Sequence, residues 1–307
     1  MGSPPIAVPA LEALSRGFDV ALVVTQPDRP KGRGRKVAPT AVHAKADELQ
    51  VPVHPCSDVN AADCLAEIER ARPDAVVVVS FGQMLKSKLL ELPRLGCINL
   101  HFSLLPELRG AAPVSWAIMN GLSRTGVSVM RMSRKMDAGA VFAQAEEPIR
   151  ADDTAATLSA RLGTLGAGLL VETVAACFDG KAEARPQDDA KATFAPKITR
   201  GMCAIHWRRD AVEVDRLIRG LAGQLEAYAY FDKEPRVRVT FHGSVLPPGH
   251  TPGTGIAARG KQGELFIGCG NGMIEAREVQ AEGRRRVTGR EFANGYHIKG
   301  GETFGNG

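Results

Sequence analysis

The sequence predicts an α/β fold, built on a mainly parallel sheet, followed by a smaller β-barrel domain. Helical and strand-like segments alternate over residues 8–120, which is typical of a parallel α/β sheet. The run 75–80 is almost entirely valine, as expected of a strand buried on both faces. After residue 235, short strand-like runs are separated by glycine-rich turns, a spacing typical of a small barrel. A length of 307 residues is enough for two such domains.

The composition is that of a soluble globular protein. Hydrophobic residues make up 44% of the chain and charged residues 24%, and the net charge of +5 is compatible with an anionic partner. We see no signal peptide and no run approaching the ~20 apolar residues that span a bilayer. The six cysteines form no C-x-x-C pair, so zinc and redox motifs are not expected. We therefore expect a cytoplasmic protein that contacts no membrane and holds no metal.

The first predicted element is a helix rather than a strand. Residues 8–16 form this helix, with Gly17 as its cap, and residues 19–25 form the first strand. Doubly wound sheets usually place their first strand at the centre. We therefore expect the sheet to lack that strand, which would leave the strands that start at Val20 and Ala75 without a partner. The expectation is that the native protein begins upstream with a short apolar strand.

The remaining elements of the first half follow from apolar periodicity and end signals. Helices are predicted over 41–50, 60–71 and 113–120, strands over 51–54, 75–80, 97–100, 126–130 and 140–149, and a helix over 154–178. The last helix carries an apolar stripe of leucines four or three residues apart. Its three internal glycines lower its helix propensity, so it must pack closely on the sheet.

Residues 26–40 form a long basic loop. Its cationic residues are Arg29, Lys31, Arg33, Arg35 and Lys36. The two glycines in this loop are not followed by a third or by a helix, so they are not a dinucleotide fingerprint. Either a solvated loop or a mobile clamp on phosphate fits this composition.

The strongest candidate site follows the strand 97–100. Asn99 and His101 are two residues apart and share a face of the strand. An amide can donate to a developing oxyanion, and an imidazole can exchange a proton near neutral pH. Asp137 follows the next strand and is expected at the same carboxyl edge of a parallel sheet. A carboxylate there would hold the imidazole and favour its charged form, although two hydrogen-bonded polar groups at a strand end would show the same spacing.

The second half begins with a polar segment without periodicity. We predict domains over 1–180 and 204–307, joined by a linker over 181–203. Asp210 is expected to cap a helix that ends at Leu221. Strands are then predicted over 236–241, 254–258, 264–268 and 273–279.

The residues around the candidate site resemble a known family. The segment Gly96-Cys97-Ile98-Asn99-Leu100-His101-Phe102-Ser103-Leu104-Leu105-Pro106, then Arg109-Gly110-Ala111-Ala112-Pro113, and later Met136-Asp137-Ala138-Gly139, resembles the formyltransferases that use 10-formyltetrahydrofolate. Nearly the whole chain resembles the methionyl-tRNA formyltransferase branch of that family. Phe102 is bulkier than the residue usual there, and residues 223–230 lack a Pro-x-Pro segment.

The resemblance implies both fold and chemistry. It implies a Rossmann-like formyltransferase domain, here apparently lacking its first strand, and an OB-like barrel that binds tRNA. The enzyme would move a formyl group from 10-formyltetrahydrofolate, its co-substrate, to the α-amine of methionyl initiator tRNA for translation initiation, acting as a cytoplasmic monomer without a metal.

The same resemblance assigns residues to roles. Asn99, His101 and Asp137 would be catalytic. Two loops would bind folate, with residues Phe81, Gly82, Gln83, Met84, Leu85, Ser103, Leu104, Leu105 and Pro106. The basic loop, with Arg29, Lys31, Arg33, Arg35 and Lys36, would engage tRNA.

Other functions remain open on the sequence. A formyltransferase acting on an amino sugar nucleotide would share the catalytic domain but have no evident use for the basic loop. A hydrolase that releases formate would admit water in place of the amine. A catalytically impaired RNA-binding module is a third reading, against which the intact Asn99, His101 and Asp137 argue.

Overall fold

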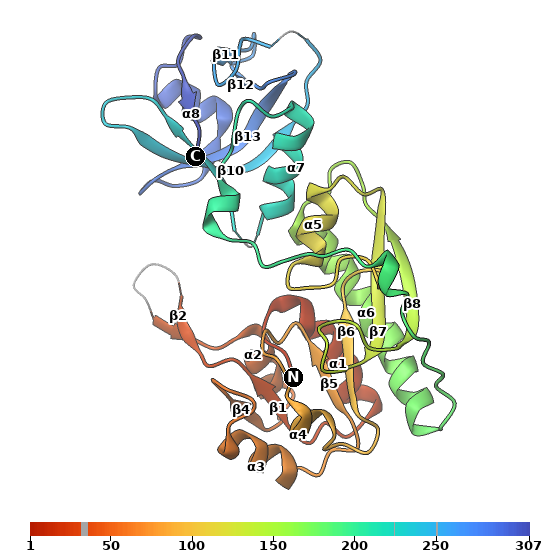
Figure 1. The fold of residues 1–307 in the computed structure, drawn as a ribbon. Helices are drawn as coiled ribbons and strands as arrows, with labels where there is room; N and C mark the ends of the chain where they lie inside the picture. The colour runs from red at the N-terminus through yellow and green to blue at the C-terminus, as the bar shows by residue number, and fades with distance from the viewer. Residues whose placement is uncertain (32–35, 224, 250) are drawn as a thin grey trace. The chain divides into compact units, whose positions relative to one another are not determined.

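The computed structural model describes residues 1–31, 36–223, 225–249 and 251–307 (Figure 1). The chain divides into two compact units, each taken by itself below. The first comprises Met1–Pro113, Arg124–Pro148 and Ser159–Pro196, and the second comprises Val114–Ser123, Ile149–Leu158 and Lys197–Gly307. The segment 181–203, expected as a linker, is thus shared between the units. Its first part joins the first unit through single β-bridges that pair Arg185 with Val141 and Phe194 with Arg109.

The sheet of the first unit is in two parts. β1 (Val23–Thr25) and β4 (Val53–Pro55) form a parallel pair, while β5 (Val76–Val79), β6 (Cys97–His101), β7 (Arg124–Arg131) and β8 (Val141–Pro148) form a four-stranded sheet in that order. β5 and β6 are parallel, as predicted for the valine-rich strand and its neighbour. β7 and β8 differ from the prediction, because each is antiparallel to the strand before it.

The two parts of the sheet meet at the start of the chain. The N–H of Gly2 donates to the carbonyl of Val24, and the N–H of Val79 donates to the carbonyl of Met1. Met1 and Gly2 therefore link β5 with β1, through the parallel bridge between Gly2 and Val79 and a 2.6 Å hydrogen bond from the terminal amine of Met1 to the carbonyl of Val77. A cavity of about 280 Å³ lies beside this bridge, with Leu11 and Leu22 among its lining residues. Strand β1 is therefore shorter than the predicted 19–25, as expected of a strand that lacks a full neighbour on one side.

Helices cover this sheet. They are η1 (Pro5–Ala7), α1 (Val8–Gly17), α2 (Ala41–Glu48), α3 (Ala62–Arg70), α4 (Ser87–Leu90) and the greater part of α6 (Ala155–Phe178), with the short η2 (Asp189–Lys191) following. A Cβ atom on Gly166 of α6 would lie 2.8 Å from Cδ2 of Leu100 in β6. The glycine therefore allows the close approach of helix to sheet that the sequence required.

Among the described helices, α6 alone is long and apolar enough to cross a membrane by length and composition. Arg161 and Glu172 interrupt its apolar run, so no uninterrupted stretch of that length was expected from the sequence. Leu162 and Leu170 of this helix are 0% exposed, which fits the core helix of a globular unit.

The basic segment is a hairpin rather than a loop. β2 (Arg29–Lys31) pairs antiparallel with β3 (Lys36–Ala38). Arg33 and Arg35 lie outside the described residues.

The second unit is built on an antiparallel barrel. Its strands are β9 (Ala227–Phe231), β10 (Val237–Val245), β11 (Ala257–Arg259), β12 (Leu265–Gly268), β13 (Met273–Ala281), β14 (Val287–Thr288) and β15 (Phe304–Gly305), in the sheet order β11-β12-β13-β10-β9-β15 with β14 beside β13. An antiparallel bridge between Ile256 and Thr303 nearly closes the sheet. The remaining helices of the unit are α5 (Pro113–Met119), η3 (Arg200–Cys203), α7 (Ala211–Leu221) and α8 (Gly289–Gly295).

Local signals explain the helices that border the barrel. Asp210 and Glu213 form a capping box at the start of α7, as predicted for Asp210, and Thr288 and Glu291 form another at α8. Trp207 packs against Phe241 and Phe304 inside the barrel, at ring-centre distances of 5.7 and 6.2 Å. β9 and β15 were not predicted. β15 has only two residues, so it carries no periodicity of its own.

Candidate active site

Strand β6 carries two buried polar side chains at its carboxyl end. Asn99 is 8% exposed and His101 is 6% exposed. All five residues of β6 are buried, so a polar group here needs a partner. Within the described part of the chain, the side-chain amide of Asn99 has no hydrogen-bond partner. It is therefore free to bind a ligand.

His101 lies between two oxygen atoms. Its Nε2 is 3.0 Å from the carbonyl oxygen of Leu108, and its Nδ1 is 3.7 Å from Oδ2 of Asp137. A carbonyl oxygen only accepts hydrogen bonds, so Nε2 carries a proton. A ring protonated at both nitrogens donates towards both oxygens, whereas a neutral ring would turn a lone pair to the carboxylate.

The loop after β7 brings Asp137 to this histidine. Because β7 is antiparallel to β6, its end at Arg131 pairs with Ile98 near the start of β6. Asp137 lies beside His101 as predicted. The prediction was wrong about the cause, because the two residues do not follow neighbouring parallel strands. The loop returns with Asp137 in a left-handed conformation at φ 49°, and the N–H of Gly110 donates to its Oδ2 at 2.8 Å.

A buried arginine and a glutamine hold that loop. Arg109 is 3% exposed, and its Nε and Nη2 donate to Oε1 of Gln187 at 3.1 and 2.8 Å. Nε2 of Gln187 then donates to the carbonyls of Asp137 and Gly139 at 2.9 and 2.7 Å. Gln187 was not predicted, since it lies in a polar segment without periodicity, and no role of its own was predicted for Arg109.

The outer end of this network is a carboxylate. Nη2 of Arg109 is 2.8 Å from Oδ1 of Asp189. Hydrogen bonds from Lys135 and then Arg109 lower the pKa of the Asp189 side chain. The carboxylate is therefore charged at neutral pH and keeps the arginine aligned.

The first predicted folate loop, residues 103–106, is fixed by the strands behind it. The hydroxyl of Ser128 donates to the carbonyl of Ser103 at 2.6 Å and accepts from the N–H of Leu105 at 3.0 Å. Gln144 adds a bond from Nε2 to the carbonyl of Leu105 at 2.9 Å. The side chains of Ser103 and Leu105 are buried, while Leu104 and Pro106 are half-buried. Phe102, a departure from the family pattern, is also buried.

The second predicted folate loop, residues 81–85, is divided between core and surface. Phe81 and Leu85 belong to the apolar core. The amide of Gln83 bridges two backbone groups, donating to the carbonyl of Cys56 at 3.0 Å and accepting from the N–H of Val59 at 2.7 Å. Gly82 and Met84 are exposed. These two residues are therefore the part of the loop that is most open to a ligand, while the carbonyls of Phe81 and Met84 already accept from Gln26 and Asn60.

Of the predicted tRNA-contacting residues, Arg29 is exposed at the base of the hairpin. Lys31 and Lys36 pair across the two strands through their backbones.

The barrel carries a second cationic surface that the sequence analysis missed. The guanidinium of Arg238 lies 4.1 Å from the ring centre of Tyr228, and that of Arg236 lies 4.6 Å from the ring centre of Tyr230. We call these four residues the Tyr–Arg face. The tyrosines lie in β9 and Arg238 lies in the antiparallel β10, where it pairs with Tyr230. Arg236 directly precedes β10, and its Nε lies 2.8 Å from Oδ1 of Asp232. Alternation of buried alanines with tyrosines in β9 was the available signal.

Known proteins resemble this chain in both of its parts. The formyl transferase family model matches residues 7–174, and the model of the formyl transferase C-terminal domain matches residues 197–297. The methionyl-tRNA formyltransferase of Geobacter sulfurreducens is 39% identical over 308 residues, covering 99% of this chain and 95% of that protein. That of Caldanaerobacter subterraneus is 38% identical over 307 residues, covering 98% and 97%.

Solved structures support the same fold. An N-formyltransferase from Helicobacter canadensis matches with a TM-score of 0.65 at 20% identity, covering 91% of this chain and 97% of that one. HypX from Aquifex aeolicus matches with a TM-score of 0.63 at 17% identity, covering 82% and 44%. The Geobacter and Caldanaerobacter enzymes match over nearly their whole length and carry one name, and the chain belongs to the methionyl-tRNA formyltransferase family.

Proposed function

We propose that this protein transfers the formyl group of 10-formyltetrahydrofolate to the α-amine of methionyl initiator tRNA. One observation carries the proposal. The side chain of Asn99 is buried and has no hydrogen-bond partner among the described residues, and it lies beside the pair of His101 and Asp137. An amide donor beside an imidazole at the end of a strand suits the stabilisation of an oxyanion.

The reaction follows from these positions. The amine nitrogen attacks the formyl carbon and a tetrahedral oxyanion forms. Asn99 donates from Nδ2 and the protonated His101 supplies charge, each such donor contributing on the order of 3 kcal/mol. The bond from carbon to N10 then breaks. The amine loses one proton and N10 gains one, so the transfer is balanced in protons.

Asp137 acts through the histidine. Its carboxylate keeps the ring oriented, and it can take the amine proton directly or through a water. Proton transfer of this kind typically contributes ~10²–10⁴ to the rate. The 3.7 Å separation in the free protein is longer than a hydrogen bond, and such contacts often shorten when substrate binds.

Folate would lie along the two loops already described. The segment 103–106, held in place by Ser128 and Gln144, and the exposed residues Gly82 and Met84 would border the folate. The structural neighbours from Helicobacter canadensis and Aquifex aeolicus were solved with folinic acid and tetrahydrofolic acid. These neighbours support a folate co-substrate here.

The tRNA acceptor is supported by the named relatives and by two cationic surfaces. The basic segment 26–40, whose sequence holds Arg29, Lys31, Arg33, Arg35 and Lys36, and the Tyr–Arg face of the barrel both suit a phosphate backbone. An enzyme with this acceptor works in the cytoplasm, where initiator tRNA is charged, and we propose that it acts there as a monomer.

The test is an acceptor comparison with the full-length protein. Labelled 10-formyltetrahydrofolate is offered with methionyl initiator tRNA, with a nucleotide-linked amino sugar, or with water alone. We expect label in the methionyl-tRNA and little formate release. Label transferred only to the sugar, or only released as formate, would replace the proposed acceptor.

A further inference from the structure

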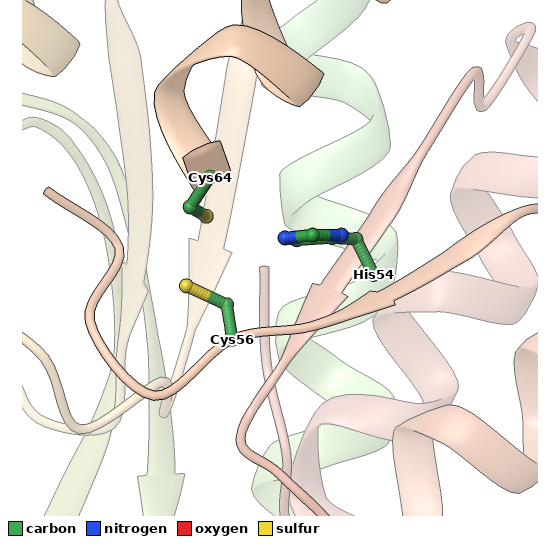
Figure 2. A group of neighbouring side chains, drawn as sticks. All are labelled: His54, Cys56 and Cys64. Carbon is green, nitrogen blue, oxygen red and sulfur yellow. The ribbon is translucent and has the colours of Figure 1, made fainter. Parts of the chain in front are cut away.

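Three side chains that could bind a metal converge behind strand β4, outside the candidate active site. His54 lies in β4, Cys56 follows it directly, and Cys64 lies in the first turn of α3. One ligand atom from each lies within 4.8 Å of the others. Cys56 and Cys64 are 5% and 1% exposed, while His54 is half-buried. Figure 2 shows the His54 ring directed at the space between the two sulfur atoms.

The two thiols differ from other buried cysteines of this chain. The sulfurs of Cys97 and Cys203 lie 3.5 and 3.4 Å from the backbone carbonyls of Leu89 and Thr199. No such carbonyl partner is found for Cys56 or Cys64 in the described residues. The His54 ring likewise has no hydrogen-bond or ion-pair partner there. The three side chains thus face one another instead of the surrounding backbone.

We propose that His54, Cys56 and Cys64 bind Zn²⁺, with water as the fourth ligand. Zinc takes imidazole nitrogen and thiolate sulfur in tetrahedral geometry, with bonds of about 2.0–2.1 Å and 2.3 Å. Those bond lengths place the ligand atoms about 3.5–3.8 Å apart. The ligand atoms lie within 4.8 Å of one another, so side-chain movements of about 1 Å would bring them to zinc-binding distances.

Charge balance selects a divalent ion. Binding releases one proton from each thiol to solvent, and the two thiolates then neutralise Zn²⁺ in a place where burial penalises net charge. A monovalent soft ion would leave one negative charge in the same apolar surroundings.

The backbone around the site is already fixed. The N–H of Cys56 donates to the carbonyl of Thr25 at 2.8 Å. Its carbonyl accepts from Gln83, whose amide also holds the N–H of Val59. The metal would therefore tie the end of β4 to α3 beneath the loop 81–85, as a structural ion rather than as part of the formyl transfer.

The spacing of these three residues along the chain does not indicate a metal site. The motif His-x-Cys-x₇-Cys matches no common zinc pattern, and no zinc was expected from a sequence without C-x-x-C. The turn between β4 and α3 brings the two cysteines together.

The proposal can be tested by cobalt substitution in the full-length protein. Metal-free protein, kept reduced and free of oxygen, is titrated with Co²⁺ and then with Zn²⁺. We expect thiolate-to-cobalt charge-transfer and tetrahedral absorption bands that saturate at one equivalent and disappear when Zn²⁺ is added. Cys56→Ser and Cys64→Ser should abolish the bands. His54→Ala should weaken the affinity by at least roughly 10–100-fold, the loss seen when even an outer partner of a ligand is removed.

Cys177→Ser is the matched control, because that half-buried thiol lies in α6, far along the chain from the group. Its titration should equal that of the unaltered protein. If the serine variants do not fold, X-ray absorption of the unaltered zinc-loaded protein decides the question, with two sulfur and two lighter ligands expected. A shell without sulfur, no bands at one equivalent, or bands that persist in folded Cys64→Ser would overturn the proposal. The proposal would also be overturned if Cys56 and Cys64 were found only as a disulfide, with no metal bound.

Discussion

Arg109 and Gln187 are joined by two hydrogen bonds from one guanidinium to one amide oxygen, at 3.1 and 2.8 Å. Because the oxygen of Gln187 accepts both, its nitrogen is directed at the backbone of the Asp137 loop. This contact spans 78 residues of sequence. It fixes the position of the carboxylate that faces His101 without touching either ring nitrogen.

Replacing Gln187 should therefore slow the reaction. Gln187→Glu removes the donor to the carbonyls of Asp137 and Gly139 while keeping the contact with Arg109. We expect kcat to fall by up to about 10²-fold, the effect of misplacing a reacting group by 1 Å, with KM for folate little changed. Steady-state kinetics with each substrate varied in turn provides the measurement.

The control for this change is Lys191→Ala, an exposed cation close by in the same segment. It should leave kcat unaltered. An unchanged kcat in Gln187→Glu would show that the contact between Arg109 and Gln187 stabilises the fold but does not position Asp137.

The sequence was sufficient to predict the parts of the site that lie within one strand or helix. Asn99 and His101 share a strand face because side chains alternate, and that needed no tertiary information. The direction of β7 could not be known, since the same apolar pattern serves parallel and antiparallel pairing. Asp137 reached His101 through a loop conformation that the sequence does not specify.

Long-range contacts were hidden for a similar reason. Gln187 has no periodic or motif signal, so only the folded chain reveals its partner. The loop 81–85 was assigned as one unit, yet its alternating burial commits Phe81 and Leu85 to the core. Cys56 and Cys64 gave no motif because a turn, rather than a short spacing, places them together.

Asn99→Ala should reduce turnover by about 10²–10³-fold, the loss typical of one oxyanion donor. The fold should persist, since the amide holds no other described residue. Asn99→Asp should be at least as slow, because it keeps the shape but places negative charge where an oxyanion forms. Single-turnover rates with saturating folate measure the chemical step.

The exposed Asn120→Ala is a suitable comparison for this amide. Its rate should match that of the unaltered protein, and all three variants should share one thermal midpoint. Rapid turnover by a folded Asn99→Ala would remove this residue from the reaction.

Replacing Arg33, Arg35 and Lys36 by alanine should weaken tRNA use far more than folate binding. Each lost phosphate contact should reduce the slope of log affinity against log salt by about 0.9. Binding of tRNA at several salt concentrations measures this slope, and a folate titration supplies the second quantity.

A charge-matched triple variant separates a local contact from net charge. Arg70, Lys88 and Arg124 have side chains that are 71%, 67% and 66% exposed, and they carry the same total charge. Their replacement by alanine should leave the slope close to its original value. Equal losses in both triple variants would mean that the hairpin contributes only general positive charge.

The Tyr–Arg face of the barrel should add a separable part of the tRNA affinity. The ring of Tyr228 supports the guanidinium of Arg238 at 4.1 Å, which holds the cation in place before any ligand arrives. Arg238→Ala removes both the charge and its contact, so affinity and salt slope should fall together. Tyr228→Leu keeps the charge and removes its support, so affinity should fall with the slope nearly unchanged. Lys261→Ala, an exposed cation elsewhere in the same unit, should alter neither quantity. If Arg238→Ala leaves the slope intact, the face binds no phosphate, and the hairpin must supply the electrostatic contacts on its own.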